Sequence, residues 1–141
     1  MSAQGNAKLA QEIYNLFSNN QFDAILPYAT EDVEVFFAPT NQTMQGHEGF
    51  KQFMMGFKTA FPNVKITVKN QVVTEDSVVT EFIATGVHTG PLMTPQGEIP
   101  PTGRTAEWPV CEVWRVRNGK LASLSNYQDF GSVLRQLGLL N

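Results

Sequence analysis

"TAEWPVCEVWRVRNGK", residues 105–120, is the stretch that decides the fold. Most of it reads as one long β-strand that ends in a turn. The pair Asn118-Gly119 is a strong signal for a two-residue hairpin, so residues 120–129 should return antiparallel to the strand. Pro109 removes a backbone donor inside the strand, which predicts either an edge position or a bulge at that residue.

The segments before this stretch place helices first and strands afterwards. Leu9, Ile13 and Phe17 recur at helical spacing, and the apolar period changes to two after Pro62. Helices followed by an antiparallel meander are typical of the α+β class, here as a single domain over residues 1–141. The predicted elements are helices at about 3–18, 22–26 and 46–62, strands at 33–38, 42–45, 64–69 and 78–88, the quoted strand and its return at 120–129, and a short helix or tail in "FGSVLRQLGLL" (130–140).

The third predicted helix carries a stripe of large apolar side chains on one face. Its members are Phe50, Phe53, Met54, Phe57 and Phe61. Such a stripe ordinarily packs into the core. In a helix that roofs a cavity, the same side chains would also contact a ligand. The sequence leaves both roles open, and Phe53 and Phe57 are our candidates for ligand contact.

Composition and charge exclude several classes of protein. Hydrophobic residues make up 42% and charged residues 16% of the chain, which indicates a folded globular protein. The net charge is −3 and the basic residues are scattered singly, so neither nucleic acid nor an anionic membrane surface is an expected partner. No apolar run approaches the ~18 residues of a membrane span, and no signal peptide is recognisable. We therefore expect a cytoplasmic protein.

Cysteine and histidine are too few for a metal site or a disulfide. Cys111 is the single cysteine, so no internal disulfide can form, and a buried core thiol is a more ordinary role for it than a nucleophile. His47 and His88 are the only histidines, and the carboxylates are not clustered. We expect no metal and no organic cofactor.

"GVHTGPLMTPQGEIPPTGR", residues 86–104, connects two predicted strands. The connection is far longer than a hairpin needs. Its prolines stiffen the chain and its glycines permit tight turns. An ordered segment at 89–103 would serve as a lid over a cavity or as an arm onto a neighbouring subunit, and the sequence leaves both open.

Several short motifs spread over nearly the whole chain form a recognisable set: "GHEGF" (46–50), "FP" (61–62), "GVHTG" (86–90), "IPPTGR" (99–104), "RNGK" (117–120) and "YQD…QLGLL" (127–140). Together they resemble the SnoaL-like polyketide cyclase family, from about residue 9 to the C-terminus. That family belongs to the nuclear-transport-factor-2-like superfamily. The resemblance implies a cone-shaped α+β barrel, with three N-terminal helices on a strongly curved, mainly antiparallel sheet, and a homodimer. It also implies closure of a ring by an intramolecular aldol condensation without a cofactor.

The resemblance also implies an acid/base residue. In the resembling cyclases this is an aspartate near the end of the last strand, and Asp129 matches it. If Leu121 faces the interior, strand alternation gives Tyr127 and Asp129 the same face. Burial would then raise the pKa of Asp129 towards the working pH, and Tyr127 would line the pocket or donate to an enolate. The alternative for Asp129 is the N-cap of the C-terminal helix.

Two further candidates lie at the ends of the long connection. His88 would share the proton transfer or bind an oxyanion, or else anchor the loop through a hydrogen bond. Arg104 would bind a carboxylate or ester oxygen of the substrate. Its alternative is a structural salt bridge with one of the glutamates Glu98, Glu107 and Glu112.

Two tryptophans on the quoted strand are candidates for substrate binding. Trp108 and Trp114 are both even-numbered residues of the predicted strand, so alternation places their side chains on the same face. They form either an aromatic pocket wall or a dimer face. Ser125 stands where many relatives carry a large aromatic residue, which predicts a pocket of different shape.

The expected function is acid/base chemistry, either aldol-type cyclisation or isomerisation, on a small hydrophobic carbonyl compound in an internal pocket. The fold alone does not choose a function. A non-catalytic module that binds a small molecule is therefore the alternative. An epoxide hydrolase that uses Asp129, Arg104 and Glu112 around a water is less favoured.

Overall fold

The computed structural model describes residues 2–140. Within this range no helix is both long enough and apolar enough to cross a membrane. The helices are α1 (Ala3–Ser18), α2 (Phe22–Ile25), α3 (Gly46–Ala60) and α4 (Phe130–Gln136), with short 3-10 turns η1 (Leu26–Tyr28) and η2 (Ala38–Thr40). The strands are β1 (Ala29–Phe37), β2 (Gln42–Gln45), β3 (Lys65–Val73), β4 (Ser77–Val87), β5 (Leu92–Thr94), β6 (Gly97–Ile99), β7 (Thr105–Arg117) and β8 (Lys120–Gln128).

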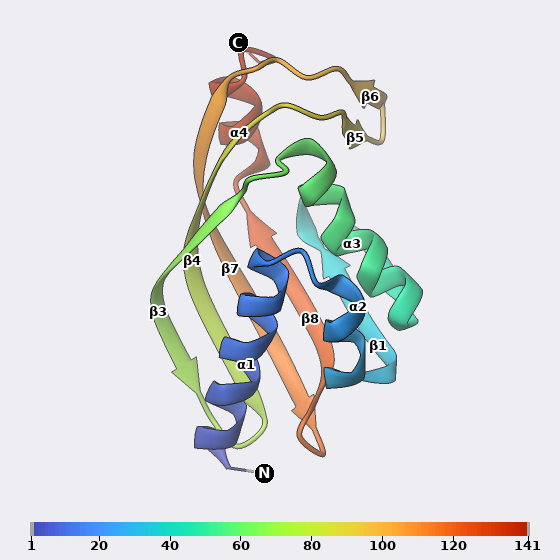
Figure 1. Cartoon of the computed structure of the whole chain (residues 1–141), viewed down its shortest axis with the longest axis vertical. Helices are drawn as coiled ribbons and strands as arrows, with labels where there is room; N and C mark the ends of the chain where they lie inside the picture. The colour runs from blue at the N-terminus through green and yellow to red at the C-terminus, as the bar shows by residue number, and fades with distance from the viewer. Residues whose placement is uncertain (1, 141) are drawn as a thin grey trace.

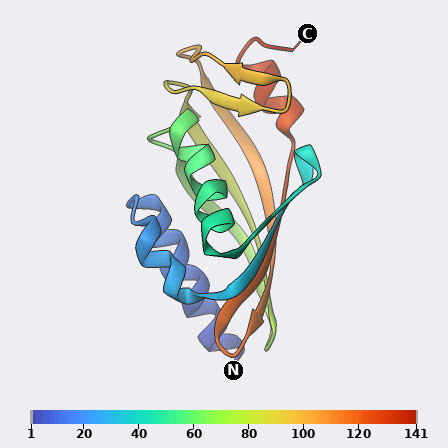
Figure 2. The same ribbon diagram turned by 90° about the vertical axis from the view of Figure 1, so that its right-hand side faces the viewer.

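Six of these strands form one curved sheet in the order β2-β1-β8-β7-β4-β3. Neighbouring strands are antiparallel except β1 and β8, which run parallel. Helices α1, α2 and α3 lie together on one side of this sheet (Figures 1 and 2). The α+β class and the predicted order of helices and strands are confirmed.

Strand β7 runs through the centre of the sheet without a bulge at Pro109. Its register with β4 is continuous through the pair Ile83–Pro109. Pairing with β8 begins only at Val110–Gln128, so Pro109 lies beyond the end of β8, where its missing N–H interrupts no pairing with that strand. The predicted bulge is therefore wrong, and because β7 is a central strand the predicted edge position holds only locally, beyond the last pair with β8. Alternation is unbroken along β7, and its even-numbered residues from 106 to 116 are buried towards the helices.

The bulge of this region lies instead beside the β7–β8 hairpin. Val116 pairs with Leu121 and Arg115 pairs with Ser123, which leaves Ala122 as an extra residue. One extra residue reverses the face to which all later side chains of a strand point. The residues of β8 that face the helices are thus Leu121, Leu124, Asn126 and Gln128.

Buried side chains form two hydrophobic clusters on the inner face of the sheet. The first packs α1 and α3 against the middle of the sheet and includes Ile13, Phe50 and Trp114. The second joins the end of α3, α4 and β5 to β4 and β7, and includes Phe61 and Trp108. Complete burial of one such large apolar side chain contributes about 1.5–3 kcal/mol, so the clusters fix how the helices sit on the sheet.

The long connection 88–104 folds back onto its own chain as the β5–β6 hairpin, which the sequence did not predict. Figure 2 shows this hairpin above the C-terminal end of α3. The amides of Thr89 and Gly90 both donate to the carbonyl of Ala60 at 3.2 Å, and Leu92 is buried. These bonds satisfy a carbonyl that the end of the helix leaves free, and they tie the start of the connection to α3.

Candidate functional site

A cavity lies between the helices and the inner face of the sheet. Helices α1 and α3 form one wall, and β3, β4, β7 and β8 form the other. The centre of a water molecule can reach about 60 Å³ of it, which is room for roughly four waters or one small ligand. The lining is almost wholly apolar and includes the aromatic side chains Tyr14, Phe17, Phe50, Phe53, Phe57, Phe82, Trp108 and Trp114.

Glu112 of β7 is the acidic side chain of this lining. It is 5% exposed, and no Lys, Arg or His within residues 2–140 forms an ion pair with it. Its Oε1 accepts hydrogen bonds from the hydroxyl of Tyr14 at 2.7 Å and the indole of Trp114 at 3.2 Å. Its Oε2 accepts from the amide of Asn126 at 2.7 Å. Burial raises the pKa of Glu112, and the three hydrogen bonds oppose that rise because they stabilise the charged form.

Three elements bring these groups together. Tyr14 comes from α1, Glu112 and Trp114 lie two residues apart on one face of β7, and Asn126 is the direct partner of Glu112 on β8. Gln128 donates from Nε2 to Oδ1 of Asn126 at 2.7 Å and so holds that amide in place. Burial is the main cause that raises the pKa of Tyr14, and the negative charge of Glu112 raises it further. The phenol therefore stays a neutral donor.

Four of the predicted binding residues line the same cavity as Glu112: Phe53, Phe57, Trp108 and Trp114. Trp108 is 2% and Trp114 is 1% exposed, so the alternative that they form a dimer face is wrong. The indole N–H of Trp108 has no hydrogen-bond partner in the described part of the chain. Contact of these side chains with a substrate stays a prediction.

The structure places Tyr127 outside the cavity. Its side chain is 47% exposed and packs edge-on against Phe36, with ring centroids 6.3 Å apart. The predicted inward orientation of Tyr127 and Asp129 is wrong because it assumed unbroken alternation from Leu121. The extra residue Ala122 turns the odd-numbered residues that follow it outwards.

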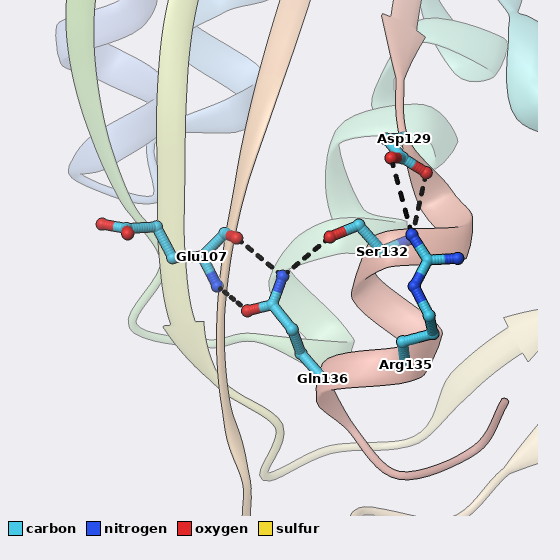
Figure 3. A network of polar contacts seen from close by, with 5 residues as sticks. All are labelled: Glu107, Asp129, Ser132, Arg135 and Gln136. Carbon is cyan, nitrogen blue, oxygen red and sulfur yellow. Dashed lines mark hydrogen bonds and ion pairs between the residues drawn. The ribbon is translucent and has the colours of Figure 1, made fainter. Parts of the chain in front are cut away.

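Asp129 is the N-cap of α4. Its Oδ1 accepts from the amide of Ser132 at 3.0 Å, and its Oδ2 lies 3.8 Å from the guanidinium of Arg135 (Figure 3). The side chain is 59% exposed and does not belong to the cavity lining. The capping alternative is thus the one that the structure shows. Proton transfer by Asp129 stays a prediction that its position does not support.

Gln136 joins helix α4 to β7 by hydrogen bonds, in addition to the apolar contacts of α4 in the second cluster. Its Oε1 accepts from the amide of Glu107 at 2.8 Å, and its Nε2 donates to the carbonyl of Glu107 at 2.8 Å (Figure 3). The side chain thereby replaces β8 as a hydrogen-bonding partner of β7 beyond the end of β8. This contact helps to fix α4, and with it Asp129, at the end of the sheet.

His88 anchors the long connection. It is 0% exposed, and its Nδ1 accepts from the amide of Thr102 at 3.1 Å. Its backbone pairs with Gly103 and Arg104 across the base of the connection. The ring lies against Phe61, and His88 is not part of the cavity lining. The loop-anchoring alternative is the one observed, and a share in proton transfer stays a prediction.

The buried His88 predicts a stability that depends on pH. Burial lowers the pKa of His88 in the folded protein, whereas the unfolded chain takes up a proton near the ordinary value of 6.5. Because the unfolded state then binds more protons, the free energy of unfolding should decrease as the pH falls below about 6.5. The decrease from this residue is at most about 1.4 kcal/mol per pH unit and stops at the folded pKa. Glu112 contributes the opposite change, because its raised pKa makes the free energy of unfolding increase as the pH falls between that pKa and 4.5. A variant of His88 is therefore needed to isolate the contribution of His88.

We expect wild type to lose more stability than His88→Asn between pH 7.5 and pH 5.5, as measured by urea unfolding. Equal losses in wild type and His88→Asn would contradict the prediction.

Arg104 and Cys111 also lie outside the cavity lining. The guanidinium of Arg104 is exposed beside Gly138, and within residues 2–140 it forms no ion pair with Glu98, Glu107 or Glu112, so the salt-bridge alternative is wrong.

Cys111 is half-buried on the outer face of β7 rather than in the core, and burial raises the pKa of its thiol. Of the three residues that an epoxide hydrolase would use, the cavity holds only Glu112.

Sequence reasoning missed the centre of the site. It treated Glu112 only as a salt-bridge partner or third carboxylate, and it did not consider Tyr14 or Asn126. A signal for Glu112 was present, because a charged residue shares the parity of Trp108 and Trp114 on an otherwise apolar face. Asn126 gave no such signal, since its inward orientation depends on the bulge.

Comparisons with solved structures show that the fold recurs widely. A protein described as a SnoaL-like polyketide cyclase from Jannaschia sp. CCS1 superposes with a TM-score of 0.87 at 20% identity, over 98% of this chain and 94% of that chain. IdmH from Streptomyces antibioticus, described as a polyketide cyclase, gives 0.77 at 24% identity over 94% and 97%. A protein of ketosteroid-isomerase-like fold from Catenulispora acidiphila, in complex with trimethylamine, gives 0.76 at 20% over 93% and 92%.

At these identities the solved structures show the fold alone, and they confirm the nuclear-transport-factor-2-like architecture. A search of curated proteins finds no match. The family is shown by the sequence model of the SnoaL-like polyketide cyclases, which matches residues 7–137. With nearly the whole chain covered, this protein belongs to the SnoaL-like polyketide cyclase family.

Proposed function

We propose that the protein is a cofactor-independent acid/base enzyme that catalyses an aldol-type cyclisation or isomerisation of a small hydrophobic carbonyl compound. Glu112 is the proton-transfer group. The observation that carries the proposal is a buried carboxyl in an aromatic cavity, held by three neutral donors and by no cation of the described chain. Burial raises the pKa of Glu112, which brings it closer to the range in which one group both accepts and returns a proton.

The chemistry needs no partner beyond the substrate. The carboxylate of Glu112 takes a proton from the carbon beside the carbonyl, which gives an enolate and a neutral carboxyl. In an isomerisation the proton returns to another carbon. In an aldol closure the enolate carbon forms a bond to a second carbonyl carbon, and Glu112 protonates the alkoxide that results. The indole N–H of Trp108, which has no hydrogen-bond partner among residues 2–140, is the donor that we assign to the enolate oxygen.

Glu112 takes the place of Asp129 in this proposal because of where the two carboxyl groups lie. Asp129 is exposed and engaged at the start of α4, whereas Glu112 lines the cavity. A proton-transfer group must come within hydrogen-bonding reach of the substrate. Glu112 meets this condition for a ligand that binds in the cavity, because its side chain is part of the lining.

A binding module for a small organic cation is the second candidate function. The cavity combines aromatic side chains with a carboxyl that lacks a cationic partner among the described residues. Aromatic faces attract alkylammonium ions, and an ammonium ion would also neutralise Glu112. The structural relative from Catenulispora acidiphila is in complex with trimethylamine, which supports this candidate.

One pair of measurements separates the two candidates. For the enzyme, incubation with small enolisable ketones and esters in D₂O should exchange the protons beside the carbonyl about 100-fold faster than buffer, as followed by NMR. Calorimetric titration with trimethylammonium chloride tests the module. Saturable ammonium binding without any exchange would favour the module over the enzyme.

We also infer a homodimer. Several apolar side chains are exposed on the outer face of the sheet, away from the helices: Val72, Val87 and Tyr127. Exposed apolar side chains that lie on one face favour association. Light scattering should give twice the mass of the chain at micromolar concentration, and the mass of a single chain would contradict the inference.

A further inference from the structure

Two residues of the cavity lining each carry a buried polar atom that has no hydrogen-bond partner among residues 2–140. One atom is the indole N–H of Trp108, a donor, and the other is Oε1 of Gln128, an acceptor. A buried acceptor without a hydrogen bond costs free energy, so such atoms are rare in folded proteins. The donor already has a role in the proposed function, whereas the acceptor has none.

The carboxylate of Glu112 determines which atom of the Gln128 amide is left without a partner. An ionised carboxylate can only accept, so Asn126 turns its amide nitrogen to Oε2 of Glu112 and donates there at 2.7 Å. Oδ1 of Asn126 then accepts from Nε2 of Gln128 at 2.7 Å. Turning over either amide would set two oxygens against each other. While Glu112 is ionised, Gln128 therefore offers the cavity an acceptor and not a donor.

The sheet register places this acceptor beside the reacting groups. Gln128 pairs with Val110 of β7, and Asn126 pairs with Glu112 at the next inward position of both strands. Trp108 is the inward residue of β7 on the other side of Val110, so it lies diagonally from Gln128. Diagonal neighbours on one face of an antiparallel pair are about 7–8 Å apart, which long side chains can span. One small ligand against Glu112 can thus meet both atoms.

We propose that Gln128 is a specificity-determining residue, whose Oε1 accepts a hydrogen bond from a hydroxyl group of the substrate. The substrate is then a hydroxyketone or a hydroxyester. Its carbonyl oxygen accepts from Trp108, its hydroxyl donates to Gln128, and the carbon beside the carbonyl faces Glu112. A hydroxyl supplies the missing donor without bringing a further charge into an apolar lining. The inference rests on the proposed function, whose carbonyl substrate it narrows to hydroxylated compounds.

Matched pairs of ketones test this inference by binding alone. Hydroxyphenylacetone is compared with methylphenylacetone, once with the substituent in the para and once in the meta position of the ring. Dissociation constants come from NMR titration at a pH at which the carboxyl signal shows Glu112 to be ionised. An apolar cavity by itself favours the methyl compound. In wild type we nevertheless expect one of the hydroxyketones to bind at least as tightly as its methyl analogue, because the methyl group leaves the acceptor buried and unpaired.

Variants assign the preference to Gln128. Gln128→Met keeps the length of the side chain and removes the acceptor, so it should weaken the hydroxyketone relative to its methyl analogue by about 10-fold. Loss of the bond to Asn126 would affect both compounds alike, so the ratio of the two dissociation constants isolates the acceptor. Trp108→Phe should weaken both compounds and keep the ratio. Tyr127→Phe, on the exposed face of β8, is the matched control and should change neither constant.

The inference is overturned if wild type prefers the methyl compound in both pairs or binds neither hydroxyketone. It is also overturned if Gln128→Met keeps the wild-type ratio, and the wild-type ratios alone decide if that variant does not fold. None of these titrations needs turnover. Absence of D₂O exchange would overturn the proposed function and leave the binding ratios as they are, so the two failures are distinguishable.

Discussion

Gly90→Ala should destabilise the protein by about 3 kcal/mol or more, at or above the top of the range for an added methyl group. A Cβ at residue 90 would overlap the carbonyl oxygen of Thr59 and lie 2.9 Å from its carbonyl carbon. Both atoms belong to the backbone of α3, so no side chain can turn aside to make room. The connection would have to move away from α3 and lose the two hydrogen bonds that Thr89 and Gly90 donate to Ala60.

Gly56→Ala is the matched control for this substitution. Gly56 lies in the same helix on its exposed side, and a Cβ there meets nothing within 4 Å. Alanine should stabilise this position by about 0.5–1 kcal/mol because glycine is a poor helix former. Urea unfolding of both variants measures the contrast. A Gly90→Ala protein within about 0.5 kcal/mol of wild type would show that the connection is not held against α3 as the structure has it.

The fold was predictable because its signals are local. The helical and strand periods gave the order of the elements, and the turn at Asn118-Gly119 has positive φ at both residues, as the hairpin signal required. The β5–β6 hairpin escaped prediction because two three-residue strands are too short to show a period.

The site was harder to predict because it depends on contacts that are distant in sequence. Tyr14 and Glu112 are 98 residues apart, and no local pattern joins them. The position of Asp129 depended on one extra residue, Ala122, whose bulge is a property of strand pairing and not of composition. The motif resemblance pointed to the end of β8, whereas the register decides which side chains of that strand face the cavity.

Glu112→Gln should lower the rate of D₂O exchange of an accepted ketone by about 10²–10⁴-fold, the usual contribution of one positioned acid/base group. Glutamine keeps the size of the side chain and an oxygen that accepts from Tyr14 and Trp114. It cannot take up or return a proton. Asp129→Asn should keep the exchange rate of wild type, because the amide oxygen still caps α4. Glu107→Gln, an exposed substitution on the same strand, is the matched control for β7 and should also keep it.

The pH dependence gives the same prediction a second readout. The base must be ionised, so exchange by wild type should increase as the pH rises through the pKa of Glu112, which burial has raised above 4.5, and then level off.

The contribution of Glu112 to the free energy of unfolding should instead decrease as the pH rises. A folded pKa above the unfolded value favours the folded state at low pH, and this contribution is lost as the pH rises through the folded pKa. Glu112→Gln lacks that loss, so its stability relative to wild type should improve with rising pH while its exchange stays low. A Glu112→Gln protein that exchanges at the wild-type rate, beside an Asp129→Asn protein that does not, would return the acid/base role to Asp129.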